Sequence, residues 1–407
     1  MRGARSLLFA VPSLLGITRR SSALMTTAAA ANALTLNDGR KHPLIGYGTY
    51  KVGFIPASAS SAAAGDSTSV EVSAAECVEM ALDVGYRFLD CAEFYNNEAE
   101  VGKAIAKSGV PREELYLASK CWTTTIHKGP EAVQAQLEKT LKDLGTDYID
   151  LYCIHWPVPG KHVAAYQQLE KAQQAGLVRS LGVSNYAVED FEELMAGGAS
   201  VVPAINQIEI NPFLHRAKTI AFFESKGVKM QSYRSLRDGK AFDDPTVVAV
   251  AAKHGRTAAQ VLGRWCVQHG YIYIPKSVKR PRMEENMNVF DFELDADDMQ
   301  KLDALTTPEA LAKYAEVRAT AAAAPPNRVA ERALCIRSPA LTTRVCVPAL
   351  PAAALRQVRA PRHARRSEDR ARAYEVDRGI ASRPLRTICP LFRAARRKAT
   401  LAYPTAP

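Results

Sequence analysis

The chain has 407 residues and a formal net charge of +11, but the positive charge belongs to its two ends. Residues 1–37 carry +4 and residues 321–407 carry +13, which leaves −6 on residues 38–320. An acidic body argues against a nucleic-acid-binding protein, and no apolar run approaches the roughly 20 residues that span a bilayer.

Residues 1–33 contain four arginines, no acidic residue and an apolar middle. This composition is typical of an organellar presequence, with a secretory signal as a less favoured interpretation. A third interpretation is that Met25 is the working start. We therefore expect a cytoplasmic protein by default, with mitochondrial or other organellar import as the alternative.

The body of the chain begins near residue 34, where residues 34–36 and 41–44 predict a β-hairpin. Residues 52–73 are rich in Ser and Ala and predict a mobile loop. Strand-like and helical patterns then alternate. The predicted strands are residues 45–50, 87–92, 115–120, 148–155, 178–184, 204–210, 229–233 and 271–277. The predicted helices are residues 74–83, 98–108, 131–143, 163–175, 187–196, 217–226, 246–254, 258–269, 281–289 and 296–305.

Eight strands that alternate with helices over about 250 residues fit a parallel (β/α)8 TIM barrel or a doubly wound sheet. The count of eight favours the barrel. So does the lack of a third glycine after Gly46 and Gly48, since a Rossmann fingerprint needs three. We predict a barrel over residues 34–318 with an N-terminal β-hairpin.

Residues 319–407 are rich in Ala, Pro and Arg and have no helical or strand periodicity. Such a composition cannot bury enough apolar area to offset chain entropy, so it predicts a disordered tail. A gene-model error that reads past the true end is the second interpretation.

The eight cysteines are scattered without a C-x-x-C pair. This spacing argues against a zinc site or a dithiol redox motif, and it favours free thiols in a reducing compartment. We therefore predict no metal centre.

Chemically active side chains gather at the ends of the predicted strands, where a parallel barrel builds its site. Lys120 ends an apolar strand and is costly to bury unless Asp90 pairs with it. The ammonium would lower the pKa of a neighbouring Tyr95 phenol, and His155 could hydrogen-bond a substrate oxygen. Together these four side chains indicate an acid–base site that moves a proton to or from a carbonyl oxygen.

Each of these residues also has an ordinary structural interpretation. Asp90 could cap the following helix, Lys120 could reach the surface, and His155 could be a hydrogen-bonded core residue. Tyr95 could be an ordinary loop aromatic. Their coincidence at neighbouring strand ends makes four unrelated structural roles the weaker interpretation.

From about residue 34 to residue 307 the chain resembles the aldo-keto reductase family and is similar to its diketogluconate-reductase- and prostaglandin-F-synthase-like members. The matching blocks are PLIGYGTYK (43–51), GYRFLDCA (85–92), YNNE (95–98), ASK (118–120), LGTDYIDLYCIHWP (144–157), GVSNY (182–186), NQ (206–207) and IPKS (274–277), followed by Arg282 and Glu285–Asn286. The resemblance implies a barrel that binds NADPH without a Rossmann domain. It implies reduction of aldehydes and ketones by hydride transfer.

The resemblance also implies roles for individual residues. Tyr95 would be the general acid, Lys120 and Asp90 the pair that lowers its pKa, and His155 the group that orients the carbonyl. We interpret Trp122 and Trp156 as walls of the substrate pocket beside Tyr95 and His155, with ordinary packing as the alternative. The implied cofactor contacts are Gly48, Thr49, Tyr50, Asp90, Ser184, Asn185, Gln207, Tyr233, Ser235, Leu236, Lys276, Ser277, Arg282, Glu285 and Asn286.

Within that set, the amide and hydroxyl groups of residues 184, 185 and 207 would hold the nicotinamide carboxamide, and Tyr233 would stack on its ring. Lys276, Ser277 and Arg282 would bind the adenosine 2′-phosphate, since two cations and a hydroxyl suit a phosphate dianion and favour NADPH over NADH. A solvated basic turn is the alternative for these three.

The chain departs from the family after Tyr233, where Arg234 and Arg237 stand in a segment that is usually Ser-Pro-Leu. These cations could bind the pyrophosphate, attract an acidic substrate or point to solvent. The tail also replaces the family's short C-terminal loop, so the resemblance does not predict which small carbonyl compound is reduced. We expect a monomer.

Two other functions compete with carbonyl reduction. A non-catalytic relative could bind the nucleotide as a sensor or a structural subunit. A Schiff-base enzyme could use Lys120 as its nucleophile.

Overall fold

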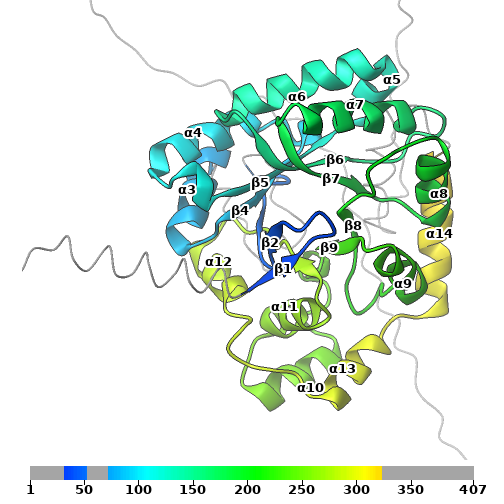
Figure 1. The fold of residues 1–407 in the computed structure, drawn as a ribbon. Helices are drawn as coiled ribbons and strands as arrows, with labels where there is room; N and C mark the ends of the chain where they lie inside the picture. The colour runs from blue at the N-terminus through cyan, green and yellow to red at the C-terminus, as the bar shows by residue number, and fades with distance from the viewer. Residues whose placement is uncertain (1–31, 53–71, 323–407) are drawn as a thin grey trace, which may run out of the picture. The chain divides into compact units, whose positions relative to one another are not determined.

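The computed structural model describes residues 32–52 and 72–322 (Figure 1). Most of the predicted presequence, residues 53–71 of the mobile loop predicted over residues 52–73, and the tail from residue 323 lie outside the described residues.

Eight parallel strands form one sheet in chain order from β3 to β10 (Figure 1). An isolated parallel bridge between Ile45 and Tyr273 joins the sheet's two edges. The Gly46 N–H donates to the Tyr273 carbonyl at 2.9 Å, and the Gly48 N–H donates to the Pro275 carbonyl at 3.0 Å. The sheet therefore closes on itself, which confirms the predicted barrel. The strands are β3 (Tyr47–Gly48), β4 (Phe88–Asp90), β5 (Tyr116–Cys121), β6 (Ile149–Ile154), β7 (Val178–Ser184), β8 (Ile205–Glu209), β9 (Lys229–Tyr233) and β10 (Ile272–Tyr273).

The first and last strands are shorter than predicted. β3 and β10 have two residues each, whereas the sequence pattern predicts strands over residues 45–50 and 271–277. Pro275 has no N–H to donate to a ladder, and Lys51 lies in the left-handed region with φ 58°. Both features end regular pairing early, and the chain continues as loops that line the open end of the barrel.

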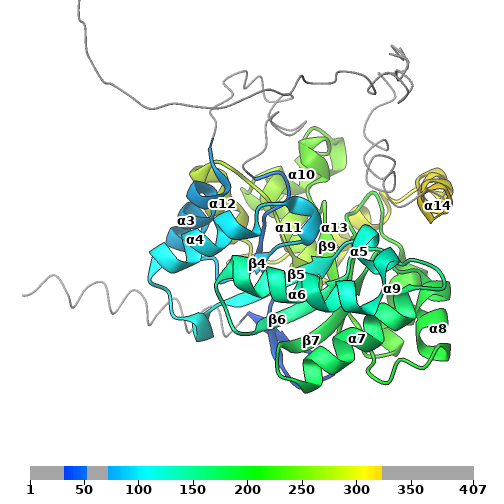
Figure 2. The same cartoon turned by 90° about the horizontal axis from the view of Figure 1, so that it is seen from above.

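All ten predicted helices are present, and two further helices are not predicted by the sequence pattern. Figure 2 shows helices packed around the outside of the barrel. The helices are α3 (Ala74–Val84), α4 (Glu98–Ser108), α5 (Thr123–Lys128), α6 (Pro130–Leu144), α7 (His162–Gln174), α8 (Val188–Ala196), α9 (Ala217–Ser225), α10 (Pro245–His254), α11 (Ala258–Gln268), α12 (Arg280–Met287), α13 (Ala296–Asp303) and α14 (Pro308–Ala322). Among the described residues, no helix is long and apolar enough to cross a membrane.

The two unpredicted helices are α5 and α14. α5 has only six residues, too few to show a helical period. α14 lies beyond residue 305, where the predicted helices end, and it extends past residue 318, where the predicted barrel ends. Its alanines favour a helix, and the Thr307 hydroxyl accepts from the Ala310 N–H at 3.2 Å at its start.

Local sequence explains where the first long helix begins and ends. Ser73 precedes α3, and its hydroxyl accepts from the Glu76 N–H while the Glu76 carboxylate accepts from the Ser73 N–H. This reciprocal capping box satisfies two otherwise unpaired donors. Gly85 ends the helix in the left-handed region with φ 115°, which glycine adopts without steric cost.

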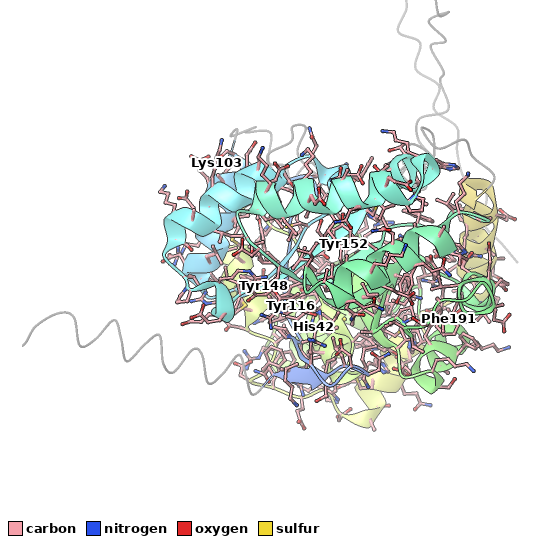
Figure 3. The ribbon with its side chains drawn as sticks, turned by 45° about the horizontal axis from the view of Figure 1, so that its top comes forward. His42, Lys103, Tyr116, Tyr148, Tyr152 and Phe191 are labelled. Atoms are coloured by element: carbon pink, nitrogen blue, oxygen red, sulfur yellow. The ribbon has the colours of Figure 1, made fainter. Side chains whose placement is uncertain are left out.

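The predicted hairpin is present and covers the N-terminal end of the barrel. β1 (Ala33–Thr35) pairs antiparallel with β2 (Lys41–Pro43). The His42 ring packs against Phe88 and Tyr116, with ring centroids 4.8 and 4.2 Å away (Figure 3). Since the hairpin covers this end, a functional site has access from the opposite end.

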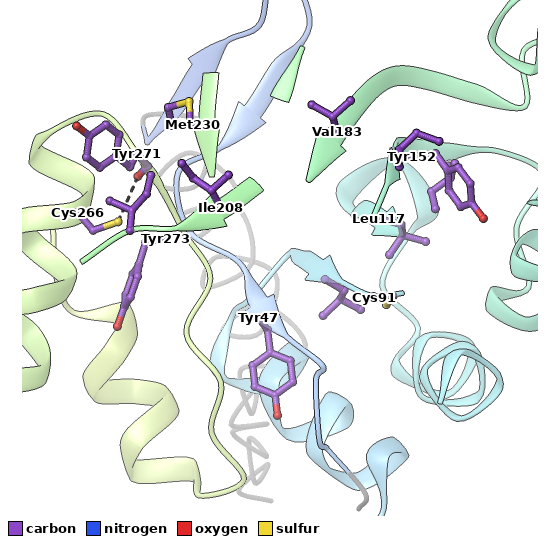
Figure 4. Close-up of a cluster of buried hydrophobic side chains, with 14 of the residues drawn as sticks. Tyr47, Cys91, Leu117, Tyr152, Val183, Ile208, Met230, Cys266, Tyr271 and Tyr273 are labelled. Carbon is purple, nitrogen blue, oxygen red and sulfur yellow. Dashed lines mark hydrogen bonds between the residues drawn. The ribbon is translucent and has the colours of Figure 1, made fainter. Parts of the chain in front are cut away.

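Side-chain alternation along the strands separates two cores. Leu117, Tyr152, Val183 and Ile208 belong to the core that also contains helix residues (Figure 4). A smaller core contains Phe88, Ala118 and other residues from strands, from their connecting segments and from the hairpin, with none from helices, so it fills the barrel interior. Because successive strand residues alternate in direction, Asp90 and Lys120 point into the interior at the C-terminal end.

Candidate active site

A cavity of about 840 Å³ opens at the C-terminal end of the barrel. Of the predicted site residues, all line this cavity except Lys120 and Thr49. Lys120 is buried. Thr49 is also buried, and its hydroxyl donates to the backbone carbonyl of Asp90 at 2.9 Å. The structure therefore brings the predicted residues together around one space, while Thr49 supports the site without lining it.

A buried ion pair forms the base of the cavity. Lys120 Nζ donates to Asp90 Oδ2 at 2.9 Å, to the Cys91 carbonyl at 2.8 Å and to the Tyr95 hydroxyl at 3.3 Å. These three acceptors match the three hydrogens of an ammonium. Asp90 Oδ1 accepts from the Gln207 amide at 2.8 Å. Both charges are therefore hydrogen-bonded, as a buried ion pair requires.

The Lys120 ammonium works to lower the pKa of Tyr95, as predicted, but burial has the larger and opposite effect. Burial raises the pKa of Tyr95 well above its ordinary value, and the neighbouring Lys120 ammonium opposes this rise without cancelling it. Burial works against the charged form of Lys120, but the charge of Asp90 and contact with Tyr95 raise the pKa of Lys120 overall. At neutral pH the site therefore holds a phenol beside an ammonium, which is the protonation state of a proton donor.

His155 closes one side of this group. Burial, followed by the charge of Lys120, lowers the pKa of His155 well below its ordinary value, so the imidazole is neutral. Its Nδ1 has no hydrogen-bond partner among the described residues. Its backbone carbonyl accepts from the Asn185 amide at 2.9 Å. A neutral imidazole that lines the cavity can donate one hydrogen bond to a ligand oxygen.

Aromatic rings form the wall beside Tyr95 and His155. The Trp122 ring stacks on Phe94 at 4.2 Å and meets the His155 ring edge-on at 4.9 Å. Trp156 also lines the cavity. Sequence reasoning missed Phe94, although it directly precedes Tyr95 and is the only other aromatic residue in that loop.

Glu93 is a second residue that sequence reasoning missed. One of its carboxylate oxygens accepts a hydrogen bond from the backbone N–H of Trp122, and the other accepts one from the Thr125 hydroxyl, each at 2.6 Å. These bonds join the 3-10 turn η1 (Glu93–Tyr95) to the start of α5. Glu93 therefore sets the position of the turn that carries Tyr95.

A cluster of hydrogen-bonded polar side chains lies across the cavity, at the ends of β7 and β9. The Tyr233 hydroxyl donates to Asn185 Oδ1 at 2.8 Å, and the Asn185 amide donates to the Ser184 hydroxyl at 3.1 Å. The Ser184 hydroxyl donates to the Gln207 carbonyl at 2.8 Å. Hydroxyl and amide groups thus line one part of the cavity. The Gln207 side chain is engaged by Asp90, which sequence reasoning did not predict.

A basic region lies at the other end of the same cavity, lined by Lys276, Ser277, Lys279 and Arg282. Burial lowers the pKa of Lys276. Gly48 lies beside this end, and a Cβ placed there would be 3.3 Å from the Ile274 carbonyl oxygen. A side chain at position 48 would therefore crowd this end, and the nearby cations suit an anionic group of a ligand.

Residues 45–307 match the sequence model of the aldo/keto reductase family. The chain belongs to this family. The glyoxal reductase of Bacillus subtilis is 41% identical over 236 residues, which are 58% of this chain and 84% of that protein. The methylglyoxal reductase DkgB of Escherichia coli O157:H7 is 40% identical over 244 residues, which are 58% of this chain and 91% of that protein.

Solved structures agree with this family assignment. A mutant of Gox0644 in complex with NADPH has a TM-score of 0.60 and 34% identity, and the match covers 68% of this chain and 94% of that one. The Bombyx mori aldo-keto reductase in complex with NADP has a TM-score of 0.59 and 31% identity, with 67% and 92% covered.

The two arginines that distinguish this aldo/keto reductase after Tyr233 have partners within the protein. Arg234 pairs with Glu209 at 3.1 Å and with Asp238 at 2.9 Å. The Arg237 guanidinium lies over the Phe213 ring at 4.5 Å. Of the three interpretations left open by the sequence, free exposure to solvent is therefore wrong for Arg234, whose charge is balanced by two carboxylates.

α14 supplies a wall of the cavity that the sequence of this aldo/keto reductase did not reveal. Tyr314, Val317 and Arg318 line the cavity. The Arg318 guanidinium pairs with Asp190 of α8 and with Glu189 at 3.9 Å. These ion pairs hold the last turns of α14 against the barrel.

Replacing Arg318 by Ala is expected to raise KM for bulky carbonyl substrates by roughly three- to tenfold, because a partly exposed charged contact contributes about 1 kcal/mol. The turnover number for the smallest aldehydes should stay nearly constant. Steady-state kinetics with substrates of increasing size measure both. Lys313→Ala, on the exposed side of the same helix, is the matched control. Equal KM values for both variants would exclude this anchoring role.

Proposed function

We propose that this protein reduces an aldehyde or ketone to an alcohol with NADPH as its cofactor. The observation that carries the proposal is the buried Lys120 ammonium, which contacts the Asp90 carboxylate and the Tyr95 hydroxyl together. The family assignment and the relatives named glyoxal reductase and methylglyoxal reductase support it.

When bound, NADPH supplies the hydride that the carbonyl carbon accepts. His155 donates a hydrogen bond to the carbonyl oxygen and orients it toward Tyr95. As negative charge develops on that oxygen, Tyr95 transfers its hydroxyl proton to it, which yields the alcohol. The Lys120 ammonium stabilises the phenolate that remains, and Asp90 holds Lys120 in place.

The basic end of the cavity fits the phosphate-bearing half of this cofactor. Lys276 and Arg282 supply positive charge and Ser277 a hydroxyl, which suit a phosphate dianion. The hydroxyl and amide groups of Ser184 and Asn185 suit a carboxamide. Six further predicted contacts, Gly48, Tyr50, Ser235, Leu236, Glu285 and Asn286, line the same cavity.

Replacing Arg282 by Ala is expected to weaken NADPH binding by roughly 10- to 100-fold and NADH binding by less than about threefold. A charge-assisted hydrogen bond to the 2′-phosphate contributes about 1.5–3 kcal/mol, and NADH has no such phosphate. Fluorescence titration with each nucleotide measures the two dissociation constants. Arg280→Ala is the control, since Arg280 lies on the same helix as Arg282 but does not line the cavity, and it pairs with Asp83 of α3 and Glu284 of α12. An equal loss for both nucleotides would remove Arg282 from phosphate recognition.

The contacts of Lys120 argue against a Schiff-base enzyme. A nucleophilic lysine must be a neutral amine, whereas Asp90 and Tyr95 raise the pKa of Lys120 against the opposing effect of burial. All three ammonium hydrogens are also engaged.

A panel of carbonyl compounds tests the proposed activity. Glyoxal and methylglyoxal come first because two relatives are named for their reduction, followed by larger aldehydes, ketones and sugars. We expect loss of NADPH absorbance with at least one compound. Tight NADPH binding without oxidation by any of them would favour a nucleotide sensor.

A further inference from the structure

We propose that His215, His269 and Asp303 bind a divalent transition-metal ion such as Zn²⁺ on the outer side of the barrel. His215 precedes α9, His269 follows α11 and Asp303 ends α13 (Figure 1). None of the three lines the cavity of the proposed active site, so this proposal does not depend on the proposed function.

The three side chains direct ligand atoms to one point. Asp303 Oδ1 lies 2.9 Å from His269 Nε2 and 3.7 Å from His215 Nδ1, and one ligand atom from each residue lies within 4.8 Å of the others. Ligand atoms about 2.0–2.2 Å from a tetrahedral Zn²⁺ are separated by about 3.3 Å. The 2.9 Å distance is shorter than this value and the 3.7 Å distance is longer. Small side-chain rotations would therefore bring the three ligand atoms to the spacing that Zn²⁺ requires.

Neighbouring groups hold these ligands in place. His215 Nε2 is hydrogen-bonded to the Tyr271 hydroxyl at 2.9 Å, which leaves Nδ1 directed toward Asp303. The His269 ring stacks on Tyr271 with an interplanar angle of 9°. The Trp265 indole N–H donates to Asp303 Oδ1 at 2.8 Å. Metal-binding histidines generally have the ring nitrogen that does not bind the metal held by a hydrogen bond, as Tyr271 holds Nε2 of His215.

The composition and exposure of the cluster indicate which ion it would bind. Two imidazoles and one carboxylate suit Zn²⁺, Co²⁺ or Ni²⁺, whereas Ca²⁺ and Mg²⁺ prefer oxygen ligands. The His215, His269 and Asp303 side chains are 12%, 21% and 36% exposed. An ion can therefore enter from solvent, and water can occupy its fourth position.

The site would stabilise the junction that leads into α14. The His215 N–H donates to the Thr306 hydroxyl at 2.7 Å, and this hydroxyl donates to the Pro212 carbonyl at 2.7 Å. The next residue, Arg216, lies over the Tyr314 ring of α14 at 4.2 Å. A bound ion would thus join three helices where the chain turns toward the cavity wall.

The test uses full-length protein that has been treated with a chelator. Titration with Co²⁺ should give saturable visible absorption bands of a low-coordinate site, and Zn²⁺ at 100 times its Kd should raise the Tm by about 5 °C. His215→Gln and His269→Gln should each lose both effects. Their metal-free Tm and NADPH binding report whether they fold.

His254→Gln is the matched control, since His254 also pairs with an aspartate, Asp298, in the described part of the chain. It should retain both metal effects. Absence of saturable Co²⁺ bands in the unaltered protein would overturn the proposal. So would bands and Tm shifts that persist in the His215 and His269 variants, since the ion would then bind elsewhere, at cysteines or adventitiously.

Discussion

Replacing Tyr95 by Phe is expected to lower kcat/KM for carbonyl reduction by about 10³-fold. Among the described residues that line the cavity, only Tyr95 has a hydroxyl that contacts the Lys120 ammonium. Loss of a general acid typically lowers the reaction rate 10²- to 10⁴-fold. The ring remains, so the wall that it forms with Tyr50 and His155 is preserved. NADPH absorbance measures the rate, and fluorescence titration measures cofactor binding.

Tyr116→Phe serves as the control for this substitution. Tyr116 is, like Tyr95, a partly buried tyrosine of the same barrel, and its hydroxyl has no partner among the described residues. It packs under the N-terminal hairpin, far from the open end of the barrel. We expect near-normal kinetics for it. Retained turnover in Tyr95→Phe would show that another group supplies the proton.

Replacing Lys120 by Met is expected to abolish reduction and to lower the free energy of unfolding by about 3–5 kcal/mol. The substitution leaves the Asp90 carboxylate buried without a counter-charge, and breaking a buried pair from one side costs this much. Asp90 keeps only the Gln207 and Gln231 amides as side-chain donors among the described residues. Denaturant unfolding and steady-state kinetics measure the two effects.

The double variant Asp90→Asn/Lys120→Met separates stability from catalysis. Removing both charges removes the penalty for an unpaired carboxylate, so most of the lost stability should return. Activity should not return, because the phenolate left by Tyr95 would have no neighbouring cation. If the double variant were no more stable than Lys120→Met, the ion pair would not be the source of the stability loss.

Much of the fold could be predicted because strand and helix periods are local. Alternation along residues 87–92 and 115–120 is enough to place Asp90 and Lys120 on one face of neighbouring strands, and the structure places them in contact. The ends of the barrel were less predictable. Closure rests on a bridge between Ile45 and Tyr273, which are far apart in the chain.

The errors have physical causes that a sequence pattern does not contain. The pKa of Tyr95 depends on how completely the phenol is buried, and burial outweighs the nearby charge. The ion pair of Arg234 with Glu209 joins the residue after β9 to the last residue of the adjacent strand β8, so neither residue alone indicates it. The end of α14 was missed for a different reason. Its alanine-rich composition is typical of low-complexity sequence, although alanine also favours helices.

Transfer of deuterium from the nicotinamide of labelled NADPH to a carbonyl substrate tests the central claim most directly. In a single turnover, we predict one deuterium on the former carbonyl carbon of the alcohol for the unaltered protein. We predict that Tyr95→Phe, with NADPH still bound, forms this labelled alcohol about 10³-fold more slowly. A protein that binds NADPH yet forms no labelled alcohol from any substrate in the panel would contradict the proposed reduction.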